Sequence, residues 1–244
     1  MSKAILITGA SRGIGAATAR LAAAGGYRVC VNYQHDGQAA DAVVAEIRAG
    51  GGHAVAMQGD VGRQDDVARI FDRAADEFGE IVALVNNAGT TGPIGSFSAA
   101  DPAVFRSVFD TNVIGTMLCA QEALRRFGPS GGAIVNLSSV AATTGAPGEY
   151  VHYAASKAAI DAFTIGLARE VADRGVRVNA VAPGSTLTEI HARAGEPGRP
   201  ERVRSRIPMQ RLAEPEEIAR AILWLLSDDA SYVTGAVLRV AGGF

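Results

Sequence analysis

A tyrosine and a lysine stand four positions apart at Tyr153 and Lys157, inside a segment with a helical pattern. Side chains at i and i+4 share one face of a helix, so the phenol and the ammonium would be neighbours. An unperturbed phenol titrates at about pH 10, and a cation beside it favours the phenolate. The pair could therefore act as an acid or a base near neutral pH. The spacing also arises by chance on helix surfaces, and Tyr150, which has Ala154 four positions on, lacks the cation.

Two further polar positions could join this chemistry. Ser138 and Ser139 follow an apolar run, and one hydroxyl could bond a substrate oxygen as its charge changes; a serine that only caps a turn is the alternative. Asn112 lies within a long apolar segment of helical pattern, where asparagine is unfavourable. A buried asparagine needs partners, and holding a water or a backbone carbonyl near Lys157 would supply them. A solvent-facing Asn112 is the other interpretation.

A glycine-rich turn, Thr8 to Gly15 (TGASRGIG), directly follows an apolar run and opens a helical pattern. Glycines at this spacing let the backbone turn tightly, approach a pyrophosphate and aim the helix N-terminus at it. The strand-turn-helix context favours a dinucleotide site over a merely structural turn. The candidate ligands in the turn are Gly9, Ser11, Arg12, Gly13, Ile14 and Gly15.

The identity of the dinucleotide depends on the residues beside the adenosine ribose. NAD sites usually place a carboxylate at the end of the second strand. Here that strand ends in Asn32 and Tyr33, which border the expected ribose position, followed by Gln34. Arg12 offers a planar guanidinium that suits a 2′-phosphate, so NADP is favoured, although Asp36 keeps NAD open.

These groups lie near the ends of short apolar runs that alternate with helical patterns. Strands are predicted at 4–8, 28–33, 53–58, 81–86, 132–138, 176–182 and 236–240. Helices are predicted at 13–24, 37–49, 63–78, 101–127, 152–174 and 215–227. Near-continuous apolar strands are typical of parallel strands that are covered on both faces. We therefore predict an α/β fold of the Rossmann type, with a doubly wound parallel sheet of about seven strands.

Polar residues between the predicted strands and helices also have predicted roles. Asp101 followed by Pro102 is typical of a helix start. Asp60 and Val61, at the end of the third strand, would border the adenine, or Asp60 would cap the next helix. The 185–211 segment, rich in Gly, Pro, Arg and Glu, is expected to be a substrate lid, with plain padding as the alternative.

The bulk composition excludes several classes of protein. A length of 244 residues with 48% hydrophobic residues predicts one domain over 1–244. A formal charge of −2 gives no reason to expect nucleic acid as a partner. No apolar stretch approaches the ~20 residues that span a membrane, and no signal-peptide pattern is present, so a cytoplasmic location is expected. Cys30 and Cys119 stand far apart in apolar surroundings and are interpreted as core thiols, with no disulfide or metal site expected.

Together these motifs resemble the classical short-chain dehydrogenase/reductase family from residue 4 to residue 243. The motifs that carry the resemblance are TGASRGIG, the run Asn86-Asn87-Ala88-Gly89, Asn112, Ser139, Tyr153 with Lys157, and Pro183-Gly184 followed by Thr188. The resemblance implies a catalytic tetrad in which Tyr153 exchanges the proton and Ser139 orients the carbonyl. Lys157 would bind the nicotinamide ribose and lower the tyrosine pKa, and Asn112 would anchor a proton-relay water.

The same resemblance implies further cofactor contacts. Those on the adenosine-ribose side would be Asn87, Ala88 and Gly89, and those at the nicotinamide and pyrophosphate would be Pro183, Gly184, Thr186 and Thr188. Three positions depart from the family pattern. The separation between Ser139 and Tyr153 is one residue longer than usual, and Thr186 stands where an aliphatic residue is common. Gln34 occupies a position that is often arginine in NADP users.

The activity that the resemblance implies is an NADP(H)-dependent transfer of hydride between nicotinamide and the carbonyl or alcohol carbon of a small molecule, by a homotetramer. A 3-oxoacyl-carrier-protein reductase or a glucose-type sugar dehydrogenase would share these motifs. A carrier-protein reductase needs basic residues at the pocket rim, and five arginines of the expected lid could supply them: Arg193, Arg199, Arg202, Arg204 and Arg206. A nucleotide-sugar epimerase would need a larger C-terminal domain. A non-catalytic redox sensor would have no chemical need for Tyr153 and Lys157.

Overall fold

A single parallel sheet forms the centre of the molecule. The computed structural model describes residues 3–244, so Met1 and Ser2 of the predicted domain lie outside the described residues. Within residues 3–244 the sheet has seven strands in the order β3-β2-β1-β4-β5-β6-β7. Their bounds are β1 Ala4–Ile7, β2 Arg28–Tyr33, β3 His53–Gln58, β4 Ile81–Asn86, β5 Gly132–Leu137, β6 Val176–Pro183 and β7 Val237–Val240. Each predicted strand is present, and the predicted Rossmann-type fold is confirmed.

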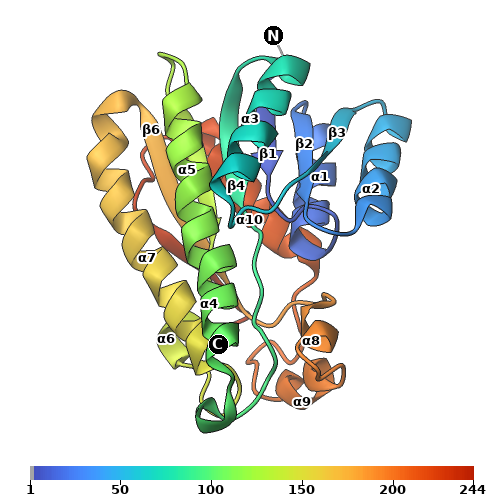
Figure 1. Ribbon diagram of the computed structural model, residues 1–244, viewed down its shortest axis with the longest axis vertical. Coiled ribbons are helices and arrows are strands. Elements are labelled where there is room, and N and C mark those ends of the chain that lie inside the picture. Colours follow the sequence, from blue (N-terminus) through green and yellow to red (C-terminus); the bar gives the residue numbers. More distant parts are fainter. Residues whose placement is uncertain (1–2) are drawn as a thin grey trace.

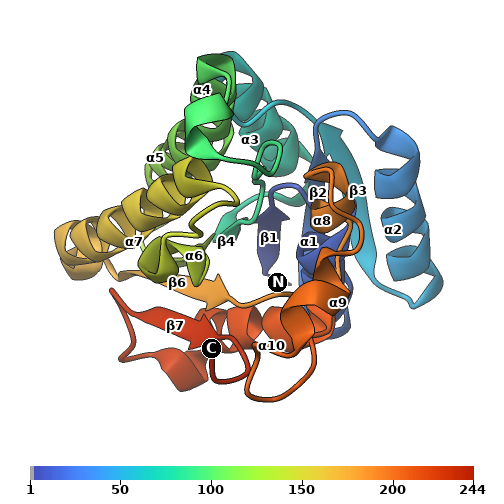
Figure 2. The ribbon, with the colours of Figure 1, turned by 90° about the horizontal axis from the view of Figure 1, so that it is seen from below.

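Helices cover both faces of this sheet (Figures 1 and 2). One face packs against α1 (Gly13–Ala24), α2 (Gly37–Ala49) and α10 (Pro215–Leu226), and the other against α3 (Gln64–Phe78), α5 (Gly115–Arg126) and α7 (Val151–Val171). Strand β1 illustrates the consequence, because Ile5 and Ile7 enter the first core while Ala4 and Leu6 enter the second. Both faces of the strand are buried, and this explains why the parallel strands are continuous apolar runs.

The helix start predicted at Asp101 and Pro102 is present in the structure. The Asp101 carboxylate accepts a hydrogen bond from the Ala103 N–H at 2.8 Å, and α4 (Pro102–Phe109) begins with proline.

Both cysteines are free and buried, in the core beneath α3 and α5, as predicted. Among the described residues, none of the helices combines the length and apolarity that crossing a membrane would need.

The predicted helix over 101–127 is present, but it contains one π-helical turn that was not predicted. The segment is α4, then a π-helical turn at Asp110–Ile114, then α5. Asn112 sits in that turn and is fully buried, so the solvent-facing interpretation of this residue is wrong. Single π-turns inside helices are frequent at functional sites.

Short helices in the connecting segments were not predicted. Three follow β5 and β6 at the carboxyl edge of the sheet: α6 (Ala141–Thr144), α8 (Ile190–Arg193) and α9 (Arg199–Arg204). Single 3₁₀ turns occupy Phe97–Ala99, Ala172–Arg174 and Asp228–Ala230. Helices of four to six residues contain too few turns for a periodic pattern to be visible. The segments that carry α8 and α9 lie below the sheet in Figure 1, across the ends of the strands.

Candidate active site

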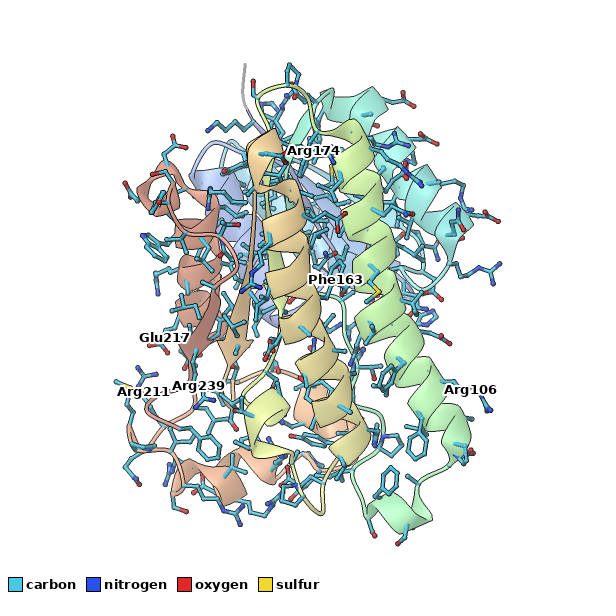
Figure 3. The ribbon with its side chains drawn as sticks, turned by 90° about the vertical axis from the view of Figure 1, so that its left-hand side faces the viewer. Arg106, Phe163, Arg174, Arg211, Glu217 and Arg239 are labelled. Carbon is cyan, nitrogen blue, oxygen red and sulfur yellow. The ribbon has the colours of Figure 1, made fainter. Side chains whose placement is uncertain are left out.

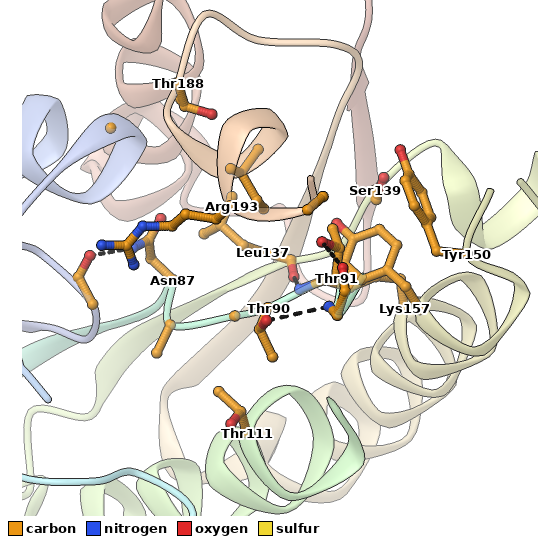
Figure 4. Close-up of a pocket in the computed structure, with 18 of the residues that line it drawn as sticks. Asn87, Thr90, Thr91, Thr111, Leu137, Ser139, Tyr150, Lys157, Thr188 and Arg193 are labelled. Atoms are coloured by element: carbon orange, nitrogen blue, oxygen red, sulfur yellow. Dashed lines mark hydrogen bonds between the residues drawn. The ribbon is translucent and has the colours of Figure 1, made fainter. Parts of the chain in front are cut away.

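A cavity of about 1280 Å³ opens at the carboxyl edge of the sheet, where the strand order reverses between β1 and β4. Ligands of open α/β sheets bind at such reversal points. All but two of the predicted site residues line this cavity; Gly15 and Asn112 do not. Figure 4 places Ser139, Tyr150 and Lys157 at one end, and Asn87 toward the other. We call these the catalytic end and the glycine-turn end.

Two glycines of the turn adopt conformations that disfavour a side chain. Gly9 has a φ of 60°, and a Cβ there would stand 2.8 Å from the Ala88 Cα. Gly13 has a φ of 52°, and its Cβ would stand 3.1 Å from the Thr188 methyl group. The backbone of the turn is therefore in close contact with the loop after β4 and with the start of the 185–211 segment.

Asparagine side chains hold this turn in place. Asn87 donates through Nδ2 to the carbonyls of Thr8 at 2.8 Å and Gly9 at 2.9 Å. Asn32 accepts from the Gly9 N–H at 3.2 Å and is almost fully buried. Gly15 is buried behind them, and a Cβ on it would approach Asn87 Nδ2 to 2.5 Å. Asn32 and Asn87 were predicted as cofactor contacts, and in the structure their side chains bind backbone groups of the turn.

Arg12 lies between two carboxylates at the outer side of the turn. Its Nη2 is 2.7 Å from Asp36 Oδ2, and its Nη1 is 2.9 Å from Glu189 Oε2. Asp36 also caps α2 by accepting from the Ala39 N–H at 3.0 Å. That backbone bond, with the charge of Arg12, lowers the pKa of Asp36. Glu189 was not predicted as a partner of Arg12, because it is 177 positions away in the chain.

At the end of β3, Asp60 borders the cavity but does not cap the following helix. Its Oδ1 accepts from the Gly62 N–H at 2.9 Å, while α3 has Arg63 as its N-cap. The cap alternative is therefore wrong, and the carboxylate stabilises a turn beside Val61 instead. Val61 is buried and also borders the cavity.

Tyr153 and Lys157 share the inner face of α7, as their spacing predicts. The Lys157 Nζ lies 5.7 Å from the centroid of the Tyr153 ring and donates to the Leu137 carbonyl at 2.5 Å. Burial lowers the pKa of Lys157 to about 8, with the charge of Asp161 opposing it. Burial raises the pKa of Tyr153, against a hydrogen bond with Ser139 and the charge of Arg199. The lowering of the Tyr153 pKa by Lys157 stays a prediction.

Ser139 and Asn112 differ in how they approach this pair. The Ser139 Oγ accepts from the Ala141 N–H at 3.1 Å and thereby starts α6, so it caps a turn and also borders the cavity. Asn112 lies behind the cavity wall, where it exchanges hydrogen bonds of 2.8 Å and 2.9 Å with the backbone of Thr90. Its Nδ2 also donates to Ser156 Oγ at 3.0 Å. Asn112 was expected to hold a water or a backbone carbonyl, and in the structure its side chain holds the backbone carbonyl of Thr90.

Three residues at the catalytic end were not among the predicted site residues. Tyr150 packs edge-on against Tyr153, with ring centroids 5.3 Å apart, although it lacks a lysine at i+4. Glu149 and Arg199 also border the cavity and form an ion pair at 2.8 Å. The longer Ser139-to-Tyr153 loop was the one available signal, since Glu149 and Tyr150 both lie in it.

Comparisons with known proteins agree with this architecture. A family model described as Enoyl-(Acyl carrier protein) reductase matches residues 9–244. The chain is 52% identical over 243 residues to an oxidoreductase of Escherichia coli K12 called Uncharacterized oxidoreductase YgfF, covering 98% of each chain. It is 42% identical to the 3-oxoacyl-[acyl-carrier-protein] reductase of Synechocystis sp., covering 98% of this chain and 95% of the relative.

A solved structure is also similar over nearly the whole length. It is a short chain dehydrogenase from Burkholderia cenocepacia J2315 in complex with NADP, with a TM-score of 0.92 and 36% identity, covering 99% of this chain and 97% of the other. Fold and site thus define an oxidoreductase class built on a dinucleotide-binding sheet. The chain belongs to the short-chain dehydrogenase/reductase family, whose members bind NAD(P).

Proposed function

We propose that this protein transfers a hydride between NADP(H) and the carbonyl or alcohol carbon of a small molecule. The observation that carries the proposal is the shared cavity, which has Ser139, Tyr153 and Lys157 at one end and the glycine turn at the other. An elongated ligand could contact both ends of this cavity. A dinucleotide, with its nicotinamide at the catalytic end, has the required form.

The residues present fit such a cofactor. Ligand pockets commonly hold about 300 to 1000 Å³, and the present cavity of about 1280 Å³ has room for a dinucleotide together with a substrate. Helix α1 begins at Gly13, has 12 residues, and its N-cap makes no side-chain capping bond. Gly13 and Ile14, in its first turn, border the cavity, and a pyrophosphate there would accept from the first N–H groups of the helix.

The chain's own groups support an acid/base step. Bound nicotinamide would donate or accept the hydride. Tyr153 would give its phenolic proton to the carbonyl oxygen in reduction, and take it back in oxidation. Ser139, which borders the cavity with Tyr153, would hold the same oxygen. Lys157 would hold the ribose hydroxyls and favour the phenolate by its charge.

Arg12 supports the proposed preference for NADP. Its guanidinium stands beside Asp36 at the end of the cavity where the adenosine ribose would lie. A 2′-phosphate would replace a carboxylate as the partner of Arg12, whereas a 2′-hydroxyl would donate to Asp36. The solved relative from Burkholderia cenocepacia was crystallised with NADP.

We further propose that the 185–211 segment acts as the substrate lid, because α8 and α9 both border the cavity. Its arginines favour a small substrate over a carrier protein. Arg199 and Arg202 pair with Glu149, and Arg204 pairs with Glu201. Charges that are already compensated attract an acidic partner weakly.

A 3-oxoacyl-carrier-protein reductase remains the second candidate. Arg193 and Arg206 both border the cavity, and neither has an ion pair within residues 3–244. These two side chains could receive an anionic group at the cavity mouth. The relative from Synechocystis carries this activity in its name.

A homotetramer is the proposed assembly. The helices turned to the viewer in Figure 3, α4 with α5 and α7, lie side by side. Their outer faces expose apolar side chains: Phe109, Ile114, Met117, Val151 and Ile165. Exposed apolar side chains that gather on one face are typical of a protein interface.

The test of the proposed function is fluorescence titration with NADPH and NADH, followed by turnover with a panel of small carbonyl compounds. Tyr153→Phe should keep NADPH affinity and lose about 10³-fold in kcat. Tyr232→Phe, which removes a fully exposed hydroxyl, is the matched control and should change neither quantity. Absence of binding by both nucleotides would refute the proposal. Unchanged turnover in Tyr153→Phe would refute the assigned acid.

A further inference from the structure

Arg199 is held at the catalytic end by contacts on three sides. Its Nε and Nη2 both donate to Glu149 Oε2, at 3.1 Å and 2.8 Å. Its Cζ lies 5.3 Å from the centroid of the Tyr150 ring. Its Nη1 lies 3.4 Å from Nδ1 of His191. The side chain is only 12% exposed, so its place is fixed by the protein.

The His191 contact requires a neutral imidazole. Its Nε2 lies 3.1 Å from the Thr186 carbonyl, which can only accept, so this nitrogen carries the hydrogen. Nδ1 is then the acceptor that faces the Arg199 guanidinium. Burial and the charge of Arg199 both lower the pKa of His191, so the ring is neutral near pH 7. One arginine of the 185–211 segment thus binds a carboxylate, an aromatic face and an imidazole.

Tyr150 connects this arginine to the candidate acid. The Tyr150 and Tyr153 rings meet edge to face at an interplanar angle of 88°. Arg199 therefore stands behind the ring that packs on Tyr153, and its charge favours the phenolate of Tyr153. The other groups near that phenol are the Ser139 hydroxyl after β5 and the Lys157 ammonium on α7.

Glu149 limits how much charge Arg199 presents. Burial raises the pKa of Glu149, but hydrogen bonds from Arg199 and Arg202 outweigh it and hold the carboxylate ionised. Arg202 reaches the same carboxylate through Oε1 at 2.7 Å and is 38% exposed. Unlike Arg199, Arg202 does not border the cavity. The two arginines thus share a partner and differ in their position relative to Tyr153.

We propose that Arg199 is a positioning residue for Tyr153, which fixes the Tyr150 ring against it and brings a positive charge to it when the 185–211 segment covers the cavity. Glu149 is the counter-ion that sets the size of this charge. The inference rests on the proposed function for its catalytic meaning. Its physical content, the effect of Arg199 on the Tyr153 phenol, is independent of any substrate.

The test is an ultraviolet difference titration of the phenol, in which each protein is compared with the same protein carrying Tyr153→Phe. Arg199→Met should raise the pKa of Tyr153, because the positive charge is removed. Glu149→Gln should lower it, because the amide still accepts from Arg199 while the opposing charge is gone. Arg202→Met, the matched control, should leave it near the wild-type value. Circular dichroism at each pH verifies that the variants are folded.

Turnover supplies a second measurement. At a pH below the wild-type pKa, alcohol oxidation by Arg199→Met should fall about threefold and by Glu149→Gln should rise about threefold. Arg199→Lys keeps the charge and should restore most of the rate. Shifts in the same direction for both variants, or an equal shift in Arg202→Met, would overturn the inference. If Arg199→Met does not fold, Glu149→Gln and Arg199→Lys still decide it.

Failure of the proposed function gives a different result. In that case no carbonyl compound is turned over by the wild-type protein, while the ultraviolet titration still reports whether Arg199 and Glu149 act on Tyr153. Turnover that depends on Tyr153, together with a phenol that is insensitive to both variants, would refute the inference alone.

Discussion

The two ends of the cavity are built in different ways. At the glycine-turn end, backbone groups of Thr8 and Gly9 are held by Asn32 in β2 and by Asn87 directly after β4, the two strands on either side of β1. At the catalytic end, long side chains contact one another, as Glu149 and Arg199 do in an ion pair. The glycine turn is therefore held by hydrogen bonds to its backbone groups, and the catalytic end by contacts between side chains.

This difference indicates where each end tolerates change. The glycine turn is held by hydrogen bonds and has no room for a side chain. A substitution there should therefore lower the stability of the protein. The ion pair of Glu149 with Arg199 lies outside the sheet. Its removal should leave the sheet folded and should change the pKa of Tyr153 and the turnover rate. Substitutions at three places, Lys157, Gly9 and the Arg12–Asp36 pair, test this comparison.

The largest effect is expected at Lys157, at the catalytic end. The pKa of Lys157 is about 8 in the folded protein against an ordinary 10.5, so between these pH values the lysine is protonated mainly in the unfolded chain. The free-energy cost of burying the charged ammonium is fully present below pH 8 and disappears as the pH rises toward 10.5. The stability of the folded protein therefore rises with pH in this window. The unfolding free energy of wild type relative to Lys157→Met should rise by roughly 3 kcal/mol.

Urea denaturation of both proteins at several pH values between 7 and 11 measures this difference. Subtracting the variant removes the contribution of every other titrating group. A difference that stays flat across the range would mean that the lysine keeps an ordinary pKa in the folded protein.

The next effect is at Gly9. A Cβ would stand 2.8 Å from the Ala88 Cα, and φ is already 60°, so Gly9→Ala combines backbone strain with a clash against main chain. We expect a loss of about 2 to 3 kcal/mol in unfolding free energy, with weaker NADPH binding.

Gly26→Ala is the control for Gly9→Ala, because its φ is 88° and a Cβ there meets no atom within 4 Å. It should lose only about 1 kcal/mol and keep nucleotide affinity. Equal losses in the two variants would mean that the packing of the turn against Ala88 contributes nothing.

The smallest effect concerns the ribose. Arg12→Ala should weaken NADPH about tenfold and leave NADH nearly unchanged, because only the 2′-phosphate uses the guanidinium. Asp36→Asn, which retains the cap on α2, should weaken NADH and strengthen NADPH. Fluorescence titration of both nucleotides measures the ratio. A parallel change in both affinities would show that Arg12 acts through the turn and not on the phosphate.

Much of the fold could be predicted, since every strand end was placed within one residue of its position in the structure. The helical prediction over 101–127 missed only the π-turn around Asn112, because a turn of five residues is too short to show a period of its own. The hydrophobic pattern did not predict α8 and α9, because these helices are too short to show a period. Gly15 was assigned to the cofactor, but the structure buries it against Asn87 and away from the cavity.

By itself the sequence determined the alternation of strands and helices, the position of the glycine turn and the common face of Tyr153 and Lys157. Each of these follows from local spacing, because helix and strand periods are properties of the backbone. Only the tertiary structure decided that Arg12 lies between Asp36 and Glu189, and that Arg199 stands behind Tyr150. A long side chain can reach many partners, and its actual partner depends on how segments far apart in the chain pack together.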